Sequence, residues 1–546
     1  MKHCVSRCFH NIPQSCHGIL RCVSSAAPIP PASELEALLA RLAALESRAR
    51  ARDERIELLE EENRWLKAQL FGRSSEKSAA EEINPEQAWL FNEAEALARA
   101  AESAPQSITI PPHERGKGGR KKLSAALPRV DVIHDLPQDQ KICAADGTAL
   151  ERIGEEISEQ LDFKPAQIRV IRNIRPKYAC PCCKSGVRIA PVPPQLLPKS
   201  LATPALLAHM TTAKFVDGIP LYRQEAQLGR LGVRIPRATS AGWMILLGGT
   251  HVVPIVNLMR EHLLEAPLIH CDETRLQVLK SDKAATADHW MWVRAGGLLG
   301  RRIILFDYDP SRGGAVPLRL FEGYRGTLVT DGYEPYESVA KTLRLVHAGC
   351  MAHVRRRFED ARKAHPVGNA DGHAREALDY IRKLYLIERA LWDREHPVDA
   401  EHRVRVRKEL SEPIMEKFHA WLEGLAPKVL PESLLGKAVY YALGQWPKLR
   451  VFLTHGEVPL DNNRCENAIR PFVLGRKGWL FSDTVKGAVA SANLYSLVET
   501  AKANGVEPHA YLSLLFAQLP HAKTLQDFEA LLPWNTKASS PAGPPP

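Results

Sequence analysis

The chain has 546 residues, too many for a single hydrophobic core, so several packed units joined by linkers are expected. Hydrophobic residues at 45% and charged residues at 25% are typical of globular proteins and exclude a chain that is disordered throughout. The 73 Lys and Arg against 63 Asp and Glu give a net charge of +10, which favours polyanionic partners such as nucleic acid. Glycines and Pro254 interrupt the most apolar stretch, residues 241–259, so no membrane span is expected.

The N-terminal part divides into an extension and a heptad repeat. Residues 1–30 are basic and lack the apolar run of a secretory signal, which predicts a disordered, dispensable extension or a start codon assigned too early. Residues 31–71 carry apolar side chains at heptad spacing and predict a leucine-zipper coiled coil. Asn63 at a core position is typical of a parallel dimer, and the alternative is an amphipathic helix folded back on its own chain.

The next two segments are a linker and a cysteine-containing region. Residues 72–127 are polar and glycine-rich in part, and they predict a basic flexible linker that either contacts phosphates or is merely solvated. In residues 128–196, Cys180 and Cys183 form one C-x-x-C pair, and Cys143 begins an incomplete second pair. With Asp146 or Cys182 as a fourth ligand, this pattern predicts a zinc-ribbon-like region that binds Zn²⁺; inert thiols are the alternative.

Residues 197–262 read as helices broken by a turn at 232–236, as in a helix-turn-helix DNA-binding segment. Arg223, Arg234 and Arg237 would then face DNA phosphates. An ordinary helical hairpin with a solvated basic face has the same pattern.

Residues 263–349 change to short apolar, β-rich runs, at 268–278, 289–294, 302–308, 326–329 and 344–347, with helical stretches at 315–321 and 335–343. The expected order is β-β-β-α-β-α-β. Asp272 lies inside the first strand, where a carboxylate is costly unless a metal or partner compensates it, and Asp331 ends the fourth strand. If these strands are neighbours, both carboxylates project into one cleft.

Residues 350–455 are mostly helical and are interpreted as an insertion into this unit. At its start, His353, Arg355 and Arg357 are candidate DNA contacts, although a solvated helix face explains them equally well. Cys350 with His353 has metal-ligand spacing, but a single C-x-x-H is a weak signal.

Residues 456–515 return to the same unit and carry Glu466 in the first turn of a helix, followed by helices and, at 516–546, a C-terminal tail. Glu466 is a candidate third carboxylate; the alternative is a capping pair with Asn463. Nearby side chains that could hold phosphates or stack on a base are Arg464, Arg470, Arg476, Lys477 and Trp479. Three converging carboxylates suit two Mg²⁺ or Mn²⁺ ions, which support phosphodiester cleavage and joining.

Several phrases together resemble one known family. They are LFGRSSEK at 70–77, GEEISEQLD at 154–162, PLYRQE at 220–225, DET at 272–274, TDGY at 330–333, CMAHVRRRF at 350–358, DNNR at 461–464 followed by Glu466, GRKGWLF at 475–481 and LLPWN at 531–535. In this order they resemble the transposases of the insertion sequence 66 group, which belong to the DDE class.

The resemblance implies a multidomain α/β protein with an RNase H-like, retroviral-integrase-like catalytic core and a helical insertion. It implies that Asp272, Asp331 and Glu466 are the catalytic, Mg²⁺-binding triad. It also implies a leucine zipper, a zinc-finger-like region and a helix-turn-helix-like segment before that core. The sequence departs from the family at Asp146, where a cysteine is usual, and at Cys465, where a small residue such as alanine is usual.

The function expected from this resemblance is that of a bacterial transposase that binds terminal inverted repeats and catalyses strand cleavage and transfer. The expected partners are DNA, a second copy or more through the coiled coil, and accessory proteins of the same element. The expected location is the cytoplasm, with the nucleoid when bound to DNA. A catalytically inactive DNA-binding repressor and a structure-selective nuclease are the alternatives.

Overall fold

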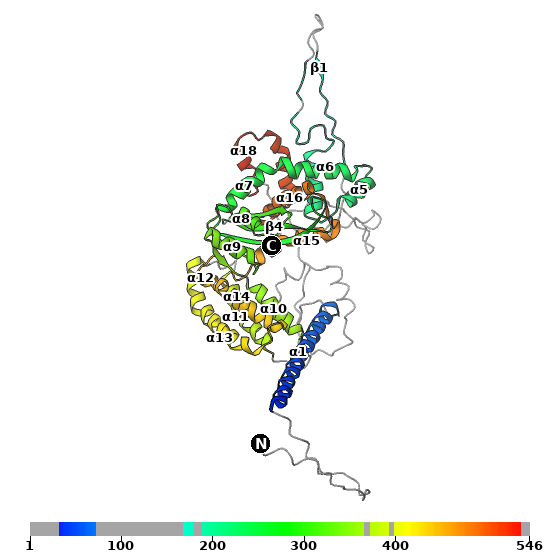
Figure 1. Cartoon of the computed structure of the whole chain (residues 1–546). Coiled ribbons are helices and arrows are strands. Elements are labelled where there is room, and N and C mark those ends of the chain that lie inside the picture. The colour runs from blue at the N-terminus through cyan, green and yellow to red at the C-terminus, as the bar shows by residue number, and fades with distance from the viewer. Residues whose placement is uncertain are drawn as a thin grey trace, which may run out of the picture.

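The computed structural model describes residues 32–71, 168–178, 188–191, 193–298, 300–364, 372–392 and 398–536. The expected extension at 1–30, the linker at 72–127 and the cysteines of the zinc-ribbon-like region lie outside the described residues. A body of sheet and helices carries a bundle of helices, α10 to α14, against which α1 lies (Figure 1).

One mixed sheet organises the body. Its order is β5-β4-β3-β6-β7: β3 (Leu268–Lys280), β4 (Asp288–Leu298) and β5 (Arg301–Asp309) are antiparallel, whereas β6 (Thr327–Val329) and β7 (Val346–Ala348) run parallel to β3. With α8 (Ala315–Leu320) and α9 (Glu334–Leu343) between the last strands, the expected β-β-β-α-β-α-β order is confirmed. The last strand begins two residues later than expected, because Arg344 adopts a left-handed conformation at the end of α9.

The edge strand β5 is covered by α16 (Val485–Ala503) through a repeated side-chain pairing. The Ser496 hydroxyl accepts a hydrogen bond from the Phe306 amide at 2.8 Å, and the Thr500 hydroxyl accepts one from the Ile304 amide at 3.0 Å. Asn504, four residues further on, accepts the Arg302 amide. Every fourth residue of α16 therefore bonds with every second residue of β5. These side chains take up backbone groups at the edge of the sheet, where no further strand among the described residues pairs.

Helices before and after the sheet complete its core. They are α4 (Pro204–Phe215), α5 (Leu221–Arg230), α6 (Arg237–Leu246), η2 (Leu247–His251), α7 (Val253–Leu264), α15 (Asn463–Trp479), α17 (Pro508–Gln518), η6 (Leu519–His521) and α18 (Leu525–Ala530). The helices predicted on either side of the turn at 232–236 are present as α5 and α6. Phe516 and Leu532 are fully buried in this core and Trp534 packs against it, so the segment expected as a tail contributes to the core.

No single helix among the described residues is long and apolar enough to cross a membrane. The apolar pair formed by α6 with η2 and by α7 bends by 49°, and its Val252, Ile255 and Met259 side chains are buried in the core.

The residues described between β7 and α15 are helical and have a core of their own. The helices are α10 (Met351–Ala364), α11 (His373–Leu391), α12 (Ala400–Val406), η3 (Arg407–Ser411), α13 (Glu412–Leu425), η4 (Ala426–Lys428), α14 (Leu434–Leu449) and η5 (Val451–Leu453). Phe358, Phe418 and Trp446 are buried at their centre. Leu268 and Val329 at the start and end of sheet strands belong to the same cluster, which fixes the bundle against the sheet.

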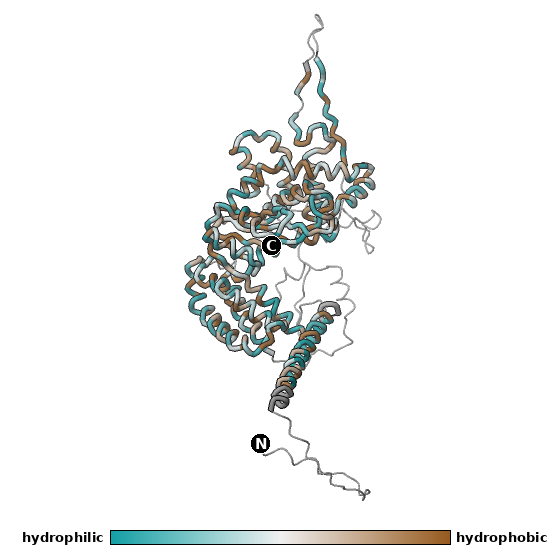
Figure 2. Tube along the Cα trace, in the orientation of Figure 1, coloured by the Kyte–Doolittle hydropathy of each residue, from teal (hydrophilic) through white to brown (hydrophobic). Residues whose placement is uncertain are grey.

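Helix α1 (Ala32–Phe71) is continuous, and hydrophobic and hydrophilic residues alternate along it (Figure 2). Of its heptad residues, Leu45 is 57% exposed and Ile56 48% exposed. Near its end, Arg64 donates to the Ala364 carbonyl at 3.1 Å, and the Glu61 carboxylate accepts the Leu434 amide at 3.0 Å. One end of the helix therefore contacts its own chain, while heptad residues such as Leu45 and Ile56 stay exposed.

A short antiparallel pair, β1 (Lys177–Tyr178) with β2 (Arg188–Ile189), joins the residues on either side of Cys180 and Cys183.

Candidate active site

Strand pairing brings Asp272 and Asp331 to the same level of the sheet. The parallel register pairs Leu268 with Thr327 and His270 with Val329, an offset of 327 − 268 = 59 residues. The two aspartates have the same offset, 331 − 272 = 59, and each lies two residues beyond the last pair. Their proximity agrees with the charge of Asp331, which raises the pKa of Asp272.

Helix α15 supplies the third carboxylate. The helix begins after Asn462, which makes no side-chain cap, and Glu466 lies in its first turn. The Glu466 carboxylate faces α10 instead of its own backbone: one oxygen lies 3.7 Å from Nδ1 of His353 and the other 3.5 Å from the Arg356 guanidinium. The capping pair with Asn463 is therefore not formed.

Asn462 fixes the start of α15 to the sheet. Its buried side chain donates to the Cys271 carbonyl at 3.0 Å and pairs with Nδ1 of His270 at 2.9 Å, while its backbone amide donates to the Cys350 sulfur at 3.2 Å. Since the Asn462 oxygen can only accept, His270 carries its proton on Nδ1. Asn462 thus connects the residue before Asp272 to the helix that carries Glu466.

The three carboxylates interact electrostatically. Burial raises the pKa of Asp272 well above its usual range, and the charges of Glu273, Asp331 and Glu466 raise it further. The one opposing contact is the Glu273 amide, which donates to the Asp272 carboxylate at 2.8 Å. A buried acid whose neighbours are acids is stabilised in its charged form by a cation.

Glu273, by contrast, has its own partners. Arg312 lies 2.6 Å from its carboxylate, and the Tyr336 hydroxyl donates to it. The Arg312 guanidinium lies over the rings of Tyr333 and Trp290, at 3.9 and 4.8 Å from their centroids. Burial raises the pKa of Glu273 in spite of these contacts. Arg312 therefore pairs with the carboxylate next to Asp272, and no ion pair of Asp272 itself is formed within the described part of the chain.

The residues present fit a divalent cation. Oε1 of Glu466 is buried without a hydrogen-bond partner, and the remaining donors at this edge of the sheet are carboxylate oxygens of the kind that Mg²⁺ and Mn²⁺ prefer. Asp272, Asp331 and Glu466 are the residues that would hold such ions.

The helical hairpin before the sheet presents several of the candidate DNA contacts. Arg223 on α5, Arg234 in the turn and Arg237 at the start of α6 are exposed. Their exposure leaves their guanidinium groups accessible to phosphates.

The remaining candidates lie on α10 and α15. Arg355, Arg357, Arg464 and Lys477 are exposed, whereas Arg470 is half-buried. Arg357 lies over the Tyr441 ring at 4.0 Å.

Two candidates near the end of α15 have contacts of their own. Arg476 is half-buried and donates to the Thr274 hydroxyl at 3.4 Å, two residues beyond Asp272. Trp479 packs edge-on against Phe472, and the Lys214 ammonium lies 5.4 Å from its ring centroid. Arg476 thus approaches the carboxylate edge, whereas Trp479 is held by the core.

Sequence reasoning missed three contributors to this site. Arg312 had not been singled out at all, whereas Asn462 and Arg356 lay in phrases that had been noticed, at 461–464 and 350–358, but without the contacts described above. The contacts of Arg312 and Arg356 join residues 39 and 110 positions apart, so no local pattern could reveal them.

These features define a protein with a mixed sheet, three acids that interact electrostatically, and basic side chains on the neighbouring helices α10 and α15. Residues 199–490, more than half of the chain, match the Transposase IS66 family, and the chain belongs to this family. Residues 140–184 match the zinc-finger binding domain of transposase IS66, 496–534 the IS66 C-terminal element, and 58–132 the Transposase C of IS166 homeodomain. The family identification expected from the sequence is confirmed.

Relatives from Sinorhizobium fredii are similar over most of their length. The uncharacterized protein y4jD is 33% identical over 434 residues, which are 76% of this chain and 82% of the relative. The uncharacterized protein y4qI is 32% identical over 521 residues, covering 92% of this chain and 94% of the relative.

Proposed function

We propose that this protein is a DDE-type transposase of a bacterial insertion sequence that binds the terminal inverted repeats of its element and catalyses metal-dependent strand cleavage and strand transfer. The observation that carries the proposal is the shared register of Asp272 and Asp331, together with the charge of Glu466 acting on Asp272. Family membership and the β-β-β-α-β-α-β order support an RNase H-like core around them.

The chemistry follows from the carboxylates. Two Mg²⁺ or Mn²⁺ ions held by Asp272, Asp331 and Glu466 would activate a water or a 3′-hydroxyl and stabilise the leaving oxygen of a phosphodiester. Asn462 orients Glu466 relative to β3, and Arg312 neutralises Glu273 so that only Asp272 presents an uncompensated charge there. Arg476, beside Thr274, is positioned to contact the phosphate of a bound strand.

The remaining parts would serve DNA binding and assembly. We assign Arg223, Arg234 and Arg237 to backbone contacts, and residues 140–184 to a Zn²⁺-binding unit, because they match the family's zinc-finger domain. The exposed heptad residues of α1 would join two copies in a coiled coil, so that both ends of the element are handled in one complex. A lower mass in solution for Leu45→Asp than for the wild type would support this assembly, and equal masses would contradict it.

Cleavage and joining of a DNA fragment that bears the element's ends, in the presence of Mg²⁺, tests the catalytic proposal. Asp272→Asn should bind DNA but do no chemistry. Asp288→Asn is the matched control, because Asp288 lies on the adjacent strand with an exposed side chain paired only with exposed Arg275. Equal activity of all three proteins would refute the triad, inactivity of the wild type with retained DNA binding would favour a repressor, and cleavage without joining would favour a nuclease.

A further inference from the structure

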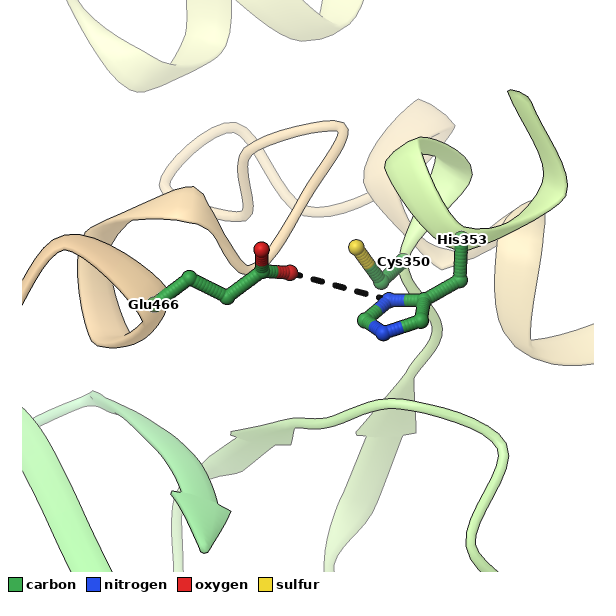
Figure 3. Close-up of side chains that lie close together, drawn as sticks. All are labelled: Cys350, His353 and Glu466. Atoms are coloured by element: carbon green, nitrogen blue, oxygen red, sulfur yellow. Dashed lines mark ion pairs between the residues drawn. The ribbon is translucent and has the colours of Figure 1, made fainter. Parts of the chain in front are cut away.

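A second set of metal-ligating side chains adjoins the carboxylates. Cys350, His353 and Glu466 place one ligand atom each within 4.8 Å of one another. The Glu466 carboxylate and the His353 ring point toward each other, with the Cys350 sulfur beside them (Figure 3). Cys350 immediately precedes α10 and His353 lies in its first turn, so both face α15 from the same side of one helix end.

Two polar atoms in this cluster are unsatisfied. Nδ1 of His353 and Oε1 of Glu466 are both buried without a hydrogen-bond partner, and their separation of 3.7 Å is too long for a hydrogen bond. A tetrahedral ion with bonds of about 2.0–2.3 Å needs ligand atoms roughly 3.3–3.8 Å apart, so this pair already has the required spacing. The sulfur needs to approach by about 1.5 Å at most.

The donor set differs in kind from the carboxylate site. Thiolate and imidazole favour Zn²⁺ and Co²⁺, whereas Mg²⁺ prefers oxygen ligands only. The Asn462 amide already donates to the Cys350 sulfur, a contact that holds the sulfur in place and would support a bound thiolate. Three protein ligands leave a fourth position open to water.

We propose that Cys350, His353 and Glu466 form a second cation site, selective for thiophilic divalent ions such as Zn²⁺, whose occupation inhibits the Mg²⁺-dependent reaction. The ion replaces the thiol proton, which passes to solvent as the sulfur–metal bond forms. Glu466 is common to both sites, so an ion bound to Cys350 and His353 withdraws it from Asp272 and Asp331. The proposed inhibition rests on the proposed function, whereas the proposed binding of the ion does not.

Titration of the full-length protein with Co²⁺, followed by the sulfur-to-cobalt charge-transfer absorption, tests binding. Cys350→Ser, which keeps a hydrogen-bond acceptor for the Asn462 amide, and His353→Gln should each lose one equivalent of the signal. Cys465→Ser is the matched control: Cys465 is also buried, but its thiol donates to the Val293 carbonyl. The cysteines at 143, 180 and 183 are present in every variant and contribute equally. Identical titrations of wild type and both cluster variants would overturn the site.

Inhibition by Zn²⁺ at constant Mg²⁺ tests the consequence. Cys350→Ser should require roughly 10-fold more Zn²⁺ for half inhibition, while Cys465→Ser behaves as the wild type. Equal inhibition of all three would overturn the inhibitory role even if the cobalt signal is lost. Absence of transposition in every protein would refute the proposed function, and the cobalt titration would still decide the site.

Discussion

Two acidic places on the same sheet have opposite electrostatics. On β5, Asp307 lies between Arg294 and Arg260, at 2.8 and 3.0 Å, and although burial raises its pKa, the two arginines bring it below its usual value. On β3, burial and three neighbouring acids raise the pKa of Asp272.

The difference separates a structural acid from a site. A buried carboxylate is tolerated in a fold when cations of the same chain pair with it, as Arg407 also does for Glu388 in the helical bundle. At the candidate site the arginine nearest to Glu466 among the described residues is Arg356, which is 64% exposed and 3.5 Å away. The uncompensated negative charge of these carboxylates attracts a cation from solution.

The largest effect is expected at the uncompensated acids. Glu466→Gln should lower strand cleavage by about 10³-fold, because a metal ligand contributes several kcal/mol to the transition state. Its melting temperature without divalent ions should stay the same or rise, since one of the repelling charges is gone. Cleavage assays and thermal unfolding scans of the two proteins test this prediction. Retained activity with a lowered melting temperature would show that Glu466 is a structural acid and not part of the site.

Asp307→Asn should lower the stability of the fold and should not act on the carboxylate site. Removing this carboxylate leaves the buried Arg294 guanidinium uncompensated and should cost about 3–5 kcal/mol of unfolding free energy. Asp309→Asn is the control: its partner Arg319 is 61% exposed, and about 1 kcal/mol or less is expected. Urea unfolding measures both, and equal losses would contradict the assignment.

Asn462→Ala should affect both properties. Two buried partners, the Cys271 carbonyl and His270, lose their contact, which should cost about 1–3 kcal/mol of stability, and a displaced Glu466 should lower activity by roughly 10- to 100-fold. Asn467→Ala, exposed on the same helix, should change neither. Loss of stability with full activity would show that Asn462 does not position Glu466.

The smallest effect concerns pH. Burial, followed by the charge of Lys448, lowers the pKa of His347 from 6.5 to about 4. The unfolded chain then binds more protons than the folded one between these values, so stability present above pH 6.5 is lost as the pH falls toward 4. His347 is half-buried, and on the order of 1 kcal/mol is expected. His347→Gln should flatten that part of the wild-type stability curve; an identical slope would refute the assignment.

The sequence by itself determined the local facts. Alternating and continuous apolar runs predicted the strands that became β3 to β7, and they placed Asp272 inside one strand and Asp331 at the end of another. The start of a helical pattern placed Glu466 in a first turn. Such features depend on neighbours within a few residues, which a sequence displays directly.

Tertiary structure decided which of these residues meet. The 59-residue register between β3 and β6, the attachment of α15 to β3 through Asn462 and the pairing of Asp307 with Arg260 all join distant segments. From the sequence, Glu466 could be either part of a helix cap or a metal ligand. Cys350 and His353 were only a weak candidate pair of metal ligands. Only packing brought these three side chains together, because the contact depends on how two cores fit against one another and not on the residues beside them.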